Sequence, residues 1–365
     1  MHKAPPTACT VNRCMLKYIF KRACWGLLVM LGVVHVIFFM FHALPGNPAD
    51  LLAGPRADRE KREQISRELK LNEPLPRQLQ GYLNDLSPVS LHRDTPRNQK
   101  KYNYLPLLKT GQRVLVLKVP YLRRSFQTNR SVASLVAEYF AGSFWLAVPA
   151  LLLATLAGSL AGIVAALYRG SLADRIIFSV SVAGISTPSF VLAVLMAIVF
   201  GYYLSDLTHL NLTGSLWENA ADGSRYLVLK NLLLPAFTLA IRPAAVIAQL
   251  MRNSMLEVLA QEYVLAARAK GLGRLQIVWR HVLRNAISPL VTSISGWLAT
   301  LIASTFFVEY IFSWKGLGLR TIQAVESMDL PVIMGAALAF SAFFILVNIL
   351  ADILHALVNP QARFV

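Results

Sequence analysis

Six apolar stretches recur along this chain of 365 residues, and each is long enough to cross a bilayer as a helix. A helical span needs roughly 20 mostly apolar residues. Stretches of this length favour helices, because a helix satisfies its own backbone hydrogen bonds where no water is available. We expect spans at 23–44, 144–168, 176–203, 232–251, 290–312 and 331–357. The sequence therefore predicts an all-α polytopic membrane protein.

The composition agrees with a membrane protein and argues against one that binds nucleic acid. Hydrophobic residues make up 55% of the chain and charged residues 15%, whereas a soluble domain carries about 25% charged residues. The formal charge of +17 comes from basic residues spread over loops, as in segments that border a membrane. Cys9, Cys14 and Cys24 are the only cysteines, so the long loops contain no disulfide framework.

Positive charges near the first span orient the chain. Lys17, Lys21 and Arg22 precede that span, and basic residues favour the cytoplasmic side, so we expect 1–22 to be a cytoplasmic segment. Six crossings would return the tail, 358–365, to the cytoplasm. Both termini are therefore predicted to be cytoplasmic.

The N-terminal region leaves two alternatives. A cleavable signal peptide competes with an uncleaved anchor, but the apolar run of the first span is longer than a typical signal core. Met15 is an alternative start to Met1. The first fourteen residues, with Pro5 and Pro6, are expected to be unstructured.

The region 45–143 is predicted to be extracytoplasmic, although it carries 17 Lys and Arg against nine acidic residues. Loops longer than about 60 residues translocate largely regardless of charge, so this excess does not overturn the topology. We expect a surface helix at 59–71, a short strand at 114–119 and a loop at 94–104. The region is thus read as a small folded part, followed by a core of spans at 144–357.

An amphipathic, basic stretch at 256–289 separates the fourth and fifth spans. Its apolar residues recur at helical spacing before and after two glycines, Gly271 and Gly273, which predict a helix, a turn and a second helix. The first set is Leu256, Leu259, Tyr263, Ala266 and Ala267, and the second is Leu275, Val278, Trp279, Val282 and Leu283. With its flanks, 252–289 is expected to be a cytoplasmic segment, either a docking element or a loop lying on lipid headgroups.

Catalytic signals are absent from the sequence. There is no G-x-x-x-x-G-K-[ST] phosphate loop and no H-E-x-x-H pair, so we expect a chain with no catalytic residue, no metal and no cofactor. His35 lies within the first span, where a histidine at a helix interface is the commoner case. Pro188 predicts a kink in the third span, and Ser186 and Ser189 beside it are expected to bond the carbonyls that the kink frees.

Arg242 and a row of small residues are unusual features of the spans. An arginine costs at least about 2.5 kcal/mol near the bilayer centre, so Arg242 should face protein or water. It either lines a pore and attracts carboxylates, or extends its head group to the interface or to a neighbouring subunit. Small residues at helical spacing in the second span predict close helix packing, namely Gly158, Ala161, Gly162 and Ala165.

Four stretches give the chain a family resemblance that reaches nearly its whole length. These are KRACWGLLVMLGVVHVIFFMFHALPGNPADLL, LADRIIFSVSVAGISTPSF, MRNSMLEVLAQEYVLAARAKGLG with the later RHVLRNAISP, and VEYIFSWKGLGLRTIQAV with the ending ADILHALVNPQARF. The chain resembles the membrane permease subunits of binding-protein-dependent ABC importers, in the dipeptide and oligopeptide branch. The resemblance implies the type I (MetI-like) permease fold with six spans and an extended extracytoplasmic loop.

The permease docking motif, E-A-A followed by three residues and Gly, fits this chain with one difference. Leu265 occupies the Glu position, before Ala266, Ala267 and Gly271, as is typical of the peptide branch. A later I-x-L-P block falls near His281 and Leu283, with Arg284 where Pro is usual. The resemblance implies that ATPase coupling uses Tyr263, Leu265, Ala266, Ala267, Arg268, Lys270, Gly271, Leu272, Gly273, His281 and Leu283. A stretch at 91–126 is expanded relative to the branch, and Arg242 is not expected there.

The resemblance implies a non-catalytic pore subunit that imports di- and oligopeptides, with ATP hydrolysis in separate subunits. The implied partners are a second, non-identical permease, two cytoplasmic ATPases and an extracytoplasmic solute-binding protein. Permeases for nickel, sugars or antimicrobial peptides are alternatives, as is a secondary transporter. The last usually shows internal repeats, which this sequence lacks. Neither the solute nor the choice between a hetero- and a homodimeric pore follows from the sequence.

Overall fold

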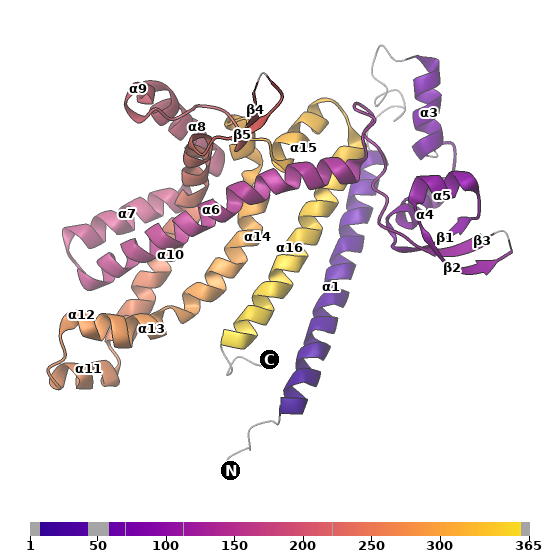
Figure 1. The fold of residues 1–365 in the computed structure, drawn as a ribbon. Helices are drawn as coiled ribbons and strands as arrows, with labels where there is room; N and C mark the ends of the chain where they lie inside the picture. The colour runs from indigo at the N-terminus through magenta and orange to yellow at the C-terminus, as the bar shows by residue number, and fades with distance from the viewer. Residues whose placement is uncertain (1–7, 43–57, 70, 112, 221, 359–365) are drawn as a thin grey trace. The chain divides into compact units, whose positions relative to one another are not determined.

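The computed structural model describes residues 8–42, 58–69, 71–111, 113–220 and 222–358, and Figure 1 labels its helices and strands. The chain divides into two compact units, which are described separately. The first unit comprises Met1–Gly26, Tyr139–Arg320 and Ala342–Val365. The second unit comprises Leu27–Glu138 and Thr321–Ser341.

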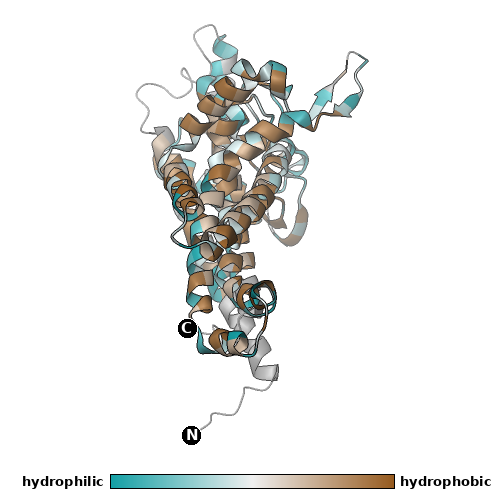
Figure 2. Ribbon diagram, turned by 90° about the vertical axis from the view of Figure 1, so that its left-hand side faces the viewer, coloured by the Kyte–Doolittle hydropathy of each residue, from teal (hydrophilic) through white to brown (hydrophobic). Residues whose placement is uncertain are grey.

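Within the described residues, five helices are long and apolar enough to cross a membrane, and a bent pair makes a sixth if it counts as one span. The five are α1 (Ala8–His42), α6 (Val132–Leu167), α10 (Lys230–Leu259), α14 (Ser288–Ile311) and α16 (Leu330–Val358). The bent pair is α7 (Leu172–Ser186) with α8 (Ser189–Met196) and the π-helix η1 (Ala197–Tyr203). Hydrophobic residues, brown in Figure 2, dominate the long helices. The all-α polytopic class predicted from the sequence is confirmed.

Several helices extend beyond the predicted spans. α6 begins at Val132 rather than at 144, and α10 ends at Leu259 rather than at 251. α1 begins at Ala8, so the expectation of an unstructured N-terminus is wrong for 8–14. No Pro or Gly occurs between residues 8 and 25, and a stretch without these helix breakers extends the helix of the apolar residues that follow.

The chain breaks its helix between α7 and α8, at Thr187 and Pro188. Thr187 is in the extended region (φ −81°, ψ 128°), and the two helices are bent by 109°. A proline disfavours helical backbone in the residue before it, which accounts for the extended Thr187. Thr187 Oγ1 donates to the carbonyl oxygen of Ala183 at 2.7 Å. The same oxygen accepts from the Thr187 amide at 3.0 Å, so the hydroxyl adds a second bond to the last turn of α7. The bonds expected of Ser186 and Ser189 to carbonyls freed by the kink stay a prediction.

In the first unit, α6 and α7 pack closely against α10 through glycines. A Cβ atom built on Gly158 would lie 2.5 Å from the carbonyl oxygen of Ala244, and one on Gly162 would lie 2.5 Å from that of Ala248. Gly184 of α7 similarly faces Ile241 of α10. The absence of side chains lets the backbones approach, as the row of small residues predicts.

A buried carboxylate organises the end of α14. Glu309 is fully buried, and its carboxylate accepts hydrogen bonds from Ser143 Oγ at 2.6 Å and from the Leu319 amide at 3.0 Å. Ser143 Oγ also accepts from the Leu317 amide at 2.8 Å. These amides lie in the first turn of α15 (Leu317–Glu326), which the span predictions did not include. Glu309 and Ser143 together satisfy donors that a helix start leaves without partners.

Short elements complete the first unit. Helix α9 (Ser205–Thr208) follows η1, and the strands β4 (Trp217–Asn219) and β5 (Arg225–Leu227) form an antiparallel pair before α10. Between α10 and α14 lie four further short helices, which form the candidate site below.

The second unit contains a three-stranded antiparallel sheet in the order β1-β3-β2. Its strands are β1 (Val89–Arg93), β2 (Leu105–Thr110) and β3 (Arg113–Leu117), and its helices before α6 are α3 (Arg59–Leu69), α4 (Leu75–Leu86) and α5 (Pro96–Tyr102). The helix predicted at 59–71 and the strand predicted at 114–119 correspond to α3 and β3. The loop predicted at 94–104 is wrong, because Thr95 caps α5 by accepting from the Asn98 amide and Pro96 starts it.

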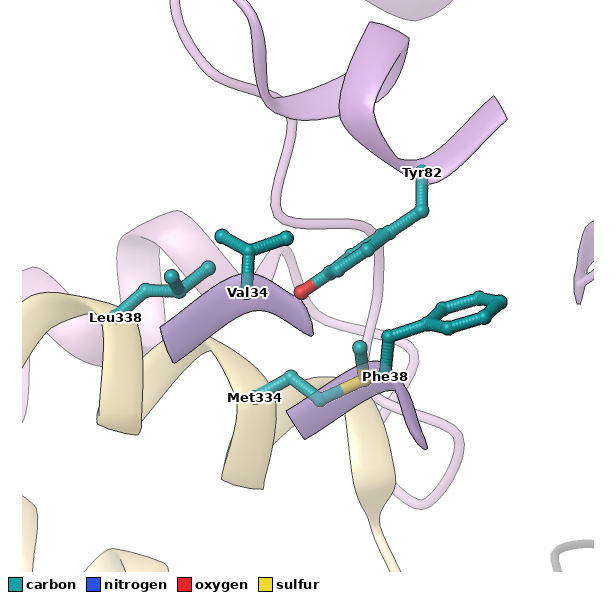
Figure 3. Close-up of a cluster of buried hydrophobic side chains, with 5 residues drawn as sticks. All are labelled: Val34, Phe38, Tyr82, Met334 and Leu338. Atoms are coloured by element: carbon teal, nitrogen blue, oxygen red, sulfur yellow. The ribbon is translucent and has the colours of Figure 1, made fainter. Parts of the chain in front are cut away.

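Apolar side chains of α1, α4 and α16 form the core of the second unit. Val34, Phe38, Tyr82, Met334 and Leu338 make one buried cluster, in which the Tyr82 ring lies among side chains from the two long helices (Figure 3). The rings of Phe38 and Tyr82 are stacked, with centroids 6.2 Å apart.

Candidate coupling segment

The predicted docking element corresponds to four short helices between α10 and α14. They are α11 (Glu262–Ala269), α12 (Arg274–Ile277), the π-helix η2 (Val278–Val282) and α13 (Leu283–Ala286). Leu256 and Leu259 belong to the end of α10, because the chain breaks at Gln261, which is extended (φ −71°, ψ 145°). The first amphipathic helix is therefore shorter than the periodicity of the sequence suggests.

Gly271 ends α11 in the left-handed region, with φ +80°. The Gly271 amide donates to the carbonyl oxygen of Arg268 at 2.9 Å and the Leu272 amide to that of Ala267 at 3.4 Å. This pair of bonds is the Schellman motif, which requires a left-handed residue and favours glycine. Gly273 has φ −61° and only caps α12, so the turn depends on the first of the two glycines.

The segment buries one side and exposes the other. Val264 and Ala267 of α11 are buried, as are Ile277, Val278, Val282 and Ala286 of the helices that follow. Large apolar side chains of the segment are solvent-exposed, namely Tyr263, Leu265, Leu275 and Trp279. We call these four the exposed apolar residues of the segment. Tyr263 and Ala267 are four residues apart in α11 and lie on one side of it, as predicted, with Tyr263 exposed and Ala267 buried.

The other predicted coupling residues divide in the same way. Ala266, Arg268, Lys270, Gly271 and Gly273 are exposed, whereas Leu272, His281 and Leu283 are partly buried. Asn285 donates from Nδ2 to Tyr263 Oη at 2.7 Å, which ties α13 to α11. Sequence reasoning missed Asn285, because a lone amide at a helix end gives no signal.

A cationic cleft of about 500 Å³ lies beside the segment. Arg169, Arg268 and Arg274 line it, over an apolar floor that includes Leu256 and Ile277. Arg274 donates to the carbonyl oxygen of Leu167, and its guanidinium lies 5.9 Å from the Tyr168 ring centroid. The end of α6 is thereby tied to the start of α12. Such a cleft is suited to receive carboxylates of a partner.

A bidentate ion pair fixes α10 just before the segment. Arg252 donates from Nε to Asp174 Oδ1 at 2.6 Å and from a terminal nitrogen to Oδ2 at 2.9 Å. The Gly170 amide also donates to Asp174 Oδ2 at 2.9 Å. The pair joins the start of α7 to α10, about two turns before α10 ends at Leu259. Both charges are visible in the sequence but their pairing is not, since 78 positions separate them.

Replacing Asp174 with asparagine is expected to lower the free energy of unfolding by about 1–3 kcal/mol, because the hydrogen bonds lose the charge of their acceptor. Thermal unfolding of the purified protein in detergent measures the effect. The control is Glu63→Gln in the exposed pair of Arg59 and Glu63, where little change is expected. Equal losses in both variants would contradict a special role for the buried pair.

Arg242 lies apart from the coupling segment. It is exposed on α10 between the partly buried Ile241 and the buried Pro243. Its assignment to a pore stays a prediction.

Comparison with known proteins assigns the chain to a family. Residues 158–364 match the family described as "Binding-protein-dependent transport system inner membrane component", and residues 15–147 match its N-terminal component. The chain belongs to this family. It is therefore an ABC importer permease and an inner-membrane component, as the sequence resemblance implied. Importers of this family depend on a binding protein and an ATPase.

Individual relatives match nearly the whole chain. The "Glutathione transport system permease protein GsiC" of Escherichia coli strain K12 is 34% identical over 351 residues, which is 96% of this chain and all of the relative. The protein of the same name from Shigella flexneri serotype 5b matches to the same extent. Among solved structures, the inward-facing MetNI methionine ABC transporter aligns with a TM-score of 0.46 and 18% identity, over 62% of this chain and 97% of that one. The family assignment rests on the sequence matches.

Proposed function

We propose that this permease imports peptides or peptide-like solutes and is driven by ATPases that bind its coupling segment. Four exposed apolar side chains of the segment carry the proposal, namely Tyr263, Leu265, Leu275 and Trp279. Exposed apolar side chains beside a cationic cleft are suited to a protein partner with an acidic rim. The alternative is a segment that lies on lipid headgroups through its Arg and Lys side chains.

Gly271→Val is expected to uncouple transport while the protein stays in the membrane. A left-handed backbone costs a residue with a side chain about 1–2 kcal/mol, so the turn after α11 should lose its geometry. Gly273→Val is the matched control, because its φ is negative and neither glycine has an atom within 4 Å of a built Cβ. ATP-dependent uptake into vesicles and co-purification of the ATPase measure the effect. Normal transport by Gly271→Val would refute the coupling role. Equal losses of transport in both variants would mean that the size of the valine side chain, and not the left-handed backbone at Gly271, causes the loss.

The topology and the partners form the second part of the proposal. We infer that both termini and the coupling segment are cytoplasmic, and that 45–143 is extracytoplasmic. Exposed aromatic side chains of α8 and α14, such as Phe190 and Phe307, support a second and non-identical permease beside the first unit, with two ATPases and a solute-binding protein completing the importer. The chain by itself supplies half of the pore and no catalytic residue.

The solute class rests on the name of the relatives. The 34% identity to proteins named glutathione transport permeases favours a short peptide carrying carboxylates. We expect glutathione or a dipeptide, rather than nickel, to raise the Tm of the cognate binding protein. Stabilisation by nickel alone would refute the peptide assignment and leave the coupling role intact.

A further inference from the structure

One face of the sheet in the second unit is covered by helices. Ser90, His92, Val114 and Val116 lie on this inner face and are buried. The His92 ring stacks on that of Tyr102 in α5, with centroids 4.3 Å apart. In Figure 1, α4 and α5 lie on the same side of the three strands.

The opposite, outer face is aliphatic over all three strands. Its residues follow from the register, which pairs Val89 with Leu117 and Leu91 with Leu115, and adds Leu105 and Leu108 from β2. Five of the six are well exposed, with exposed fractions from 42% at Leu117 to 68% at Leu105. A row of this kind across a whole sheet is a site of contact with another apolar phase.

Cationic side chains border this outer face at one end. Arg93 of β1 pairs across the sheet with Arg113 of β3, so both lie on the outer face beyond the leucines. Both are exposed. In the register no acidic residue lies on this face. An apolar face with arginines at its edge matches the boundary between lipid acyl chains and anionic headgroups.

Helix α4 holds the sheet close to two spans. Tyr82 packs on Val34 and Phe38, which lie within the candidate span Phe20–Met40. Asp85, three residues or about 4.5 Å further along α4, accepts from Tyr102 Oη at 2.7 Å, and its backbone carbonyl accepts from Lys118 Nζ at 2.7 Å. Burial lowers the pKa of Lys118 to about 8. The sheet is thereby fixed beside the end of a span.

We infer that the outer face of the β1-β3-β2 sheet rests on the bilayer surface, with its aliphatic side chains at the headgroup–acyl boundary and Arg93 and Arg113 on lipid phosphates. The nearness of the spans, the aliphatic composition and the arginines favour lipid over a protein partner. Protein interfaces are richer in aromatic side chains than this face, which has none. Contact with the bilayer would also give a role to the expanded stretch at 91–126, which supplies most residues of the outer face.

Site-specific fluorescence in vesicles tests this contact. The full-length chain, with Cys9, Cys14 and Cys24 replaced by serine, receives one cysteine by Leu108→Cys and carries an environment-sensitive NBD label there. The matched control is Lys100→Cys, an exposed position on α5, which covers the inner face. Vesicles contain phosphatidylcholine and phosphatidylglycerol with brominated acyl chains, which quench labels that enter the membrane.

We expect the label at Leu108 to be quenched roughly two-fold or more over the label at Lys100, since only the outer face enters the boundary. Arg93→Gln with Arg113→Gln should reduce the quenching in vesicles that contain phosphatidylglycerol. Equal quenching at both positions would overturn the inference. Absence of quenching together with a spectral shift at Leu108 on adding the binding protein would also overturn it, in favour of a protein partner.

Discussion

Gly162→Ala is expected to lower the free energy of unfolding by about 1–3 kcal/mol, the usual effect of forcing a methyl group into a filled interface. A Cβ atom at this position would lie 2.5 Å from the Ala248 carbonyl oxygen and 2.6 Å from Met251 Cβ. The first contact is with backbone, which no side-chain rotation relieves, so α6 and α10 must move apart. Because α10 leads directly into the coupling segment, we also expect weaker ATP-dependent uptake.

The matched control for Gly162 is Gly296→Ala in α14. A Cβ atom there meets nothing within 4 Å, and alanine favours helix over glycine by up to about 1 kcal/mol. The two variants make the same chemical change in two spans and should shift the Tm in detergent in opposite directions. A Tm of Gly162→Ala at or above that of the unchanged protein would contradict the close approach of α6 and α10.

The long apolar stretches made the spans predictable, because length and hydropathy act locally in the sequence. Small residues at helical spacing likewise indicated the packing of α6, although not that α10 is its partner. The same holds for Pro188, whose effect on Thr187 depends only on neighbouring atoms. Features that depend on neighbouring residues in this way can be predicted from the sequence.

The coupling segment was harder to predict, since its face depends on tertiary contacts. Periodicity grouped Leu256 and Leu259 with Ala267 on one helix, but the chain breaks at Gln261. Val264 and Ala267 are the buried residues of the separate helix α11. The ion pair that fixes α10 before the segment is long-range as well, since it joins Arg252 to Asp174. The motif residues identified the segment because they match the docking motif of the family. Which of them are exposed could be known only from the fold.

Glu309 shows the same limit for a single buried group, and its replacement is expected to have the largest effect of all. Glu309→Ala removes the acceptor of the Ser143 hydroxyl and of the Leu319 amide, in a place that is fully buried. Each donor left unbonded costs about 1–3 kcal/mol, and the lost side chain leaves a cavity. We expect a loss of about 3–5 kcal/mol in the free energy of unfolding, measured by denaturation in detergent.

The control for Glu309 is Glu138→Ala, which removes a half-exposed carboxylate paired with Arg130 at 2.7 Å. Exposed pairs contribute at most about 1 kcal/mol, so this variant should stay close to the unchanged protein. Hydrogen exchange adds a local readout, because the Leu319 amide should exchange faster in Glu309→Ala once its acceptor is gone. Unchanged protection of that amide would contradict the role of Glu309 as the acceptor for the first turn of α15, whatever the global stability, since the carboxylate acts on that turn through this bond.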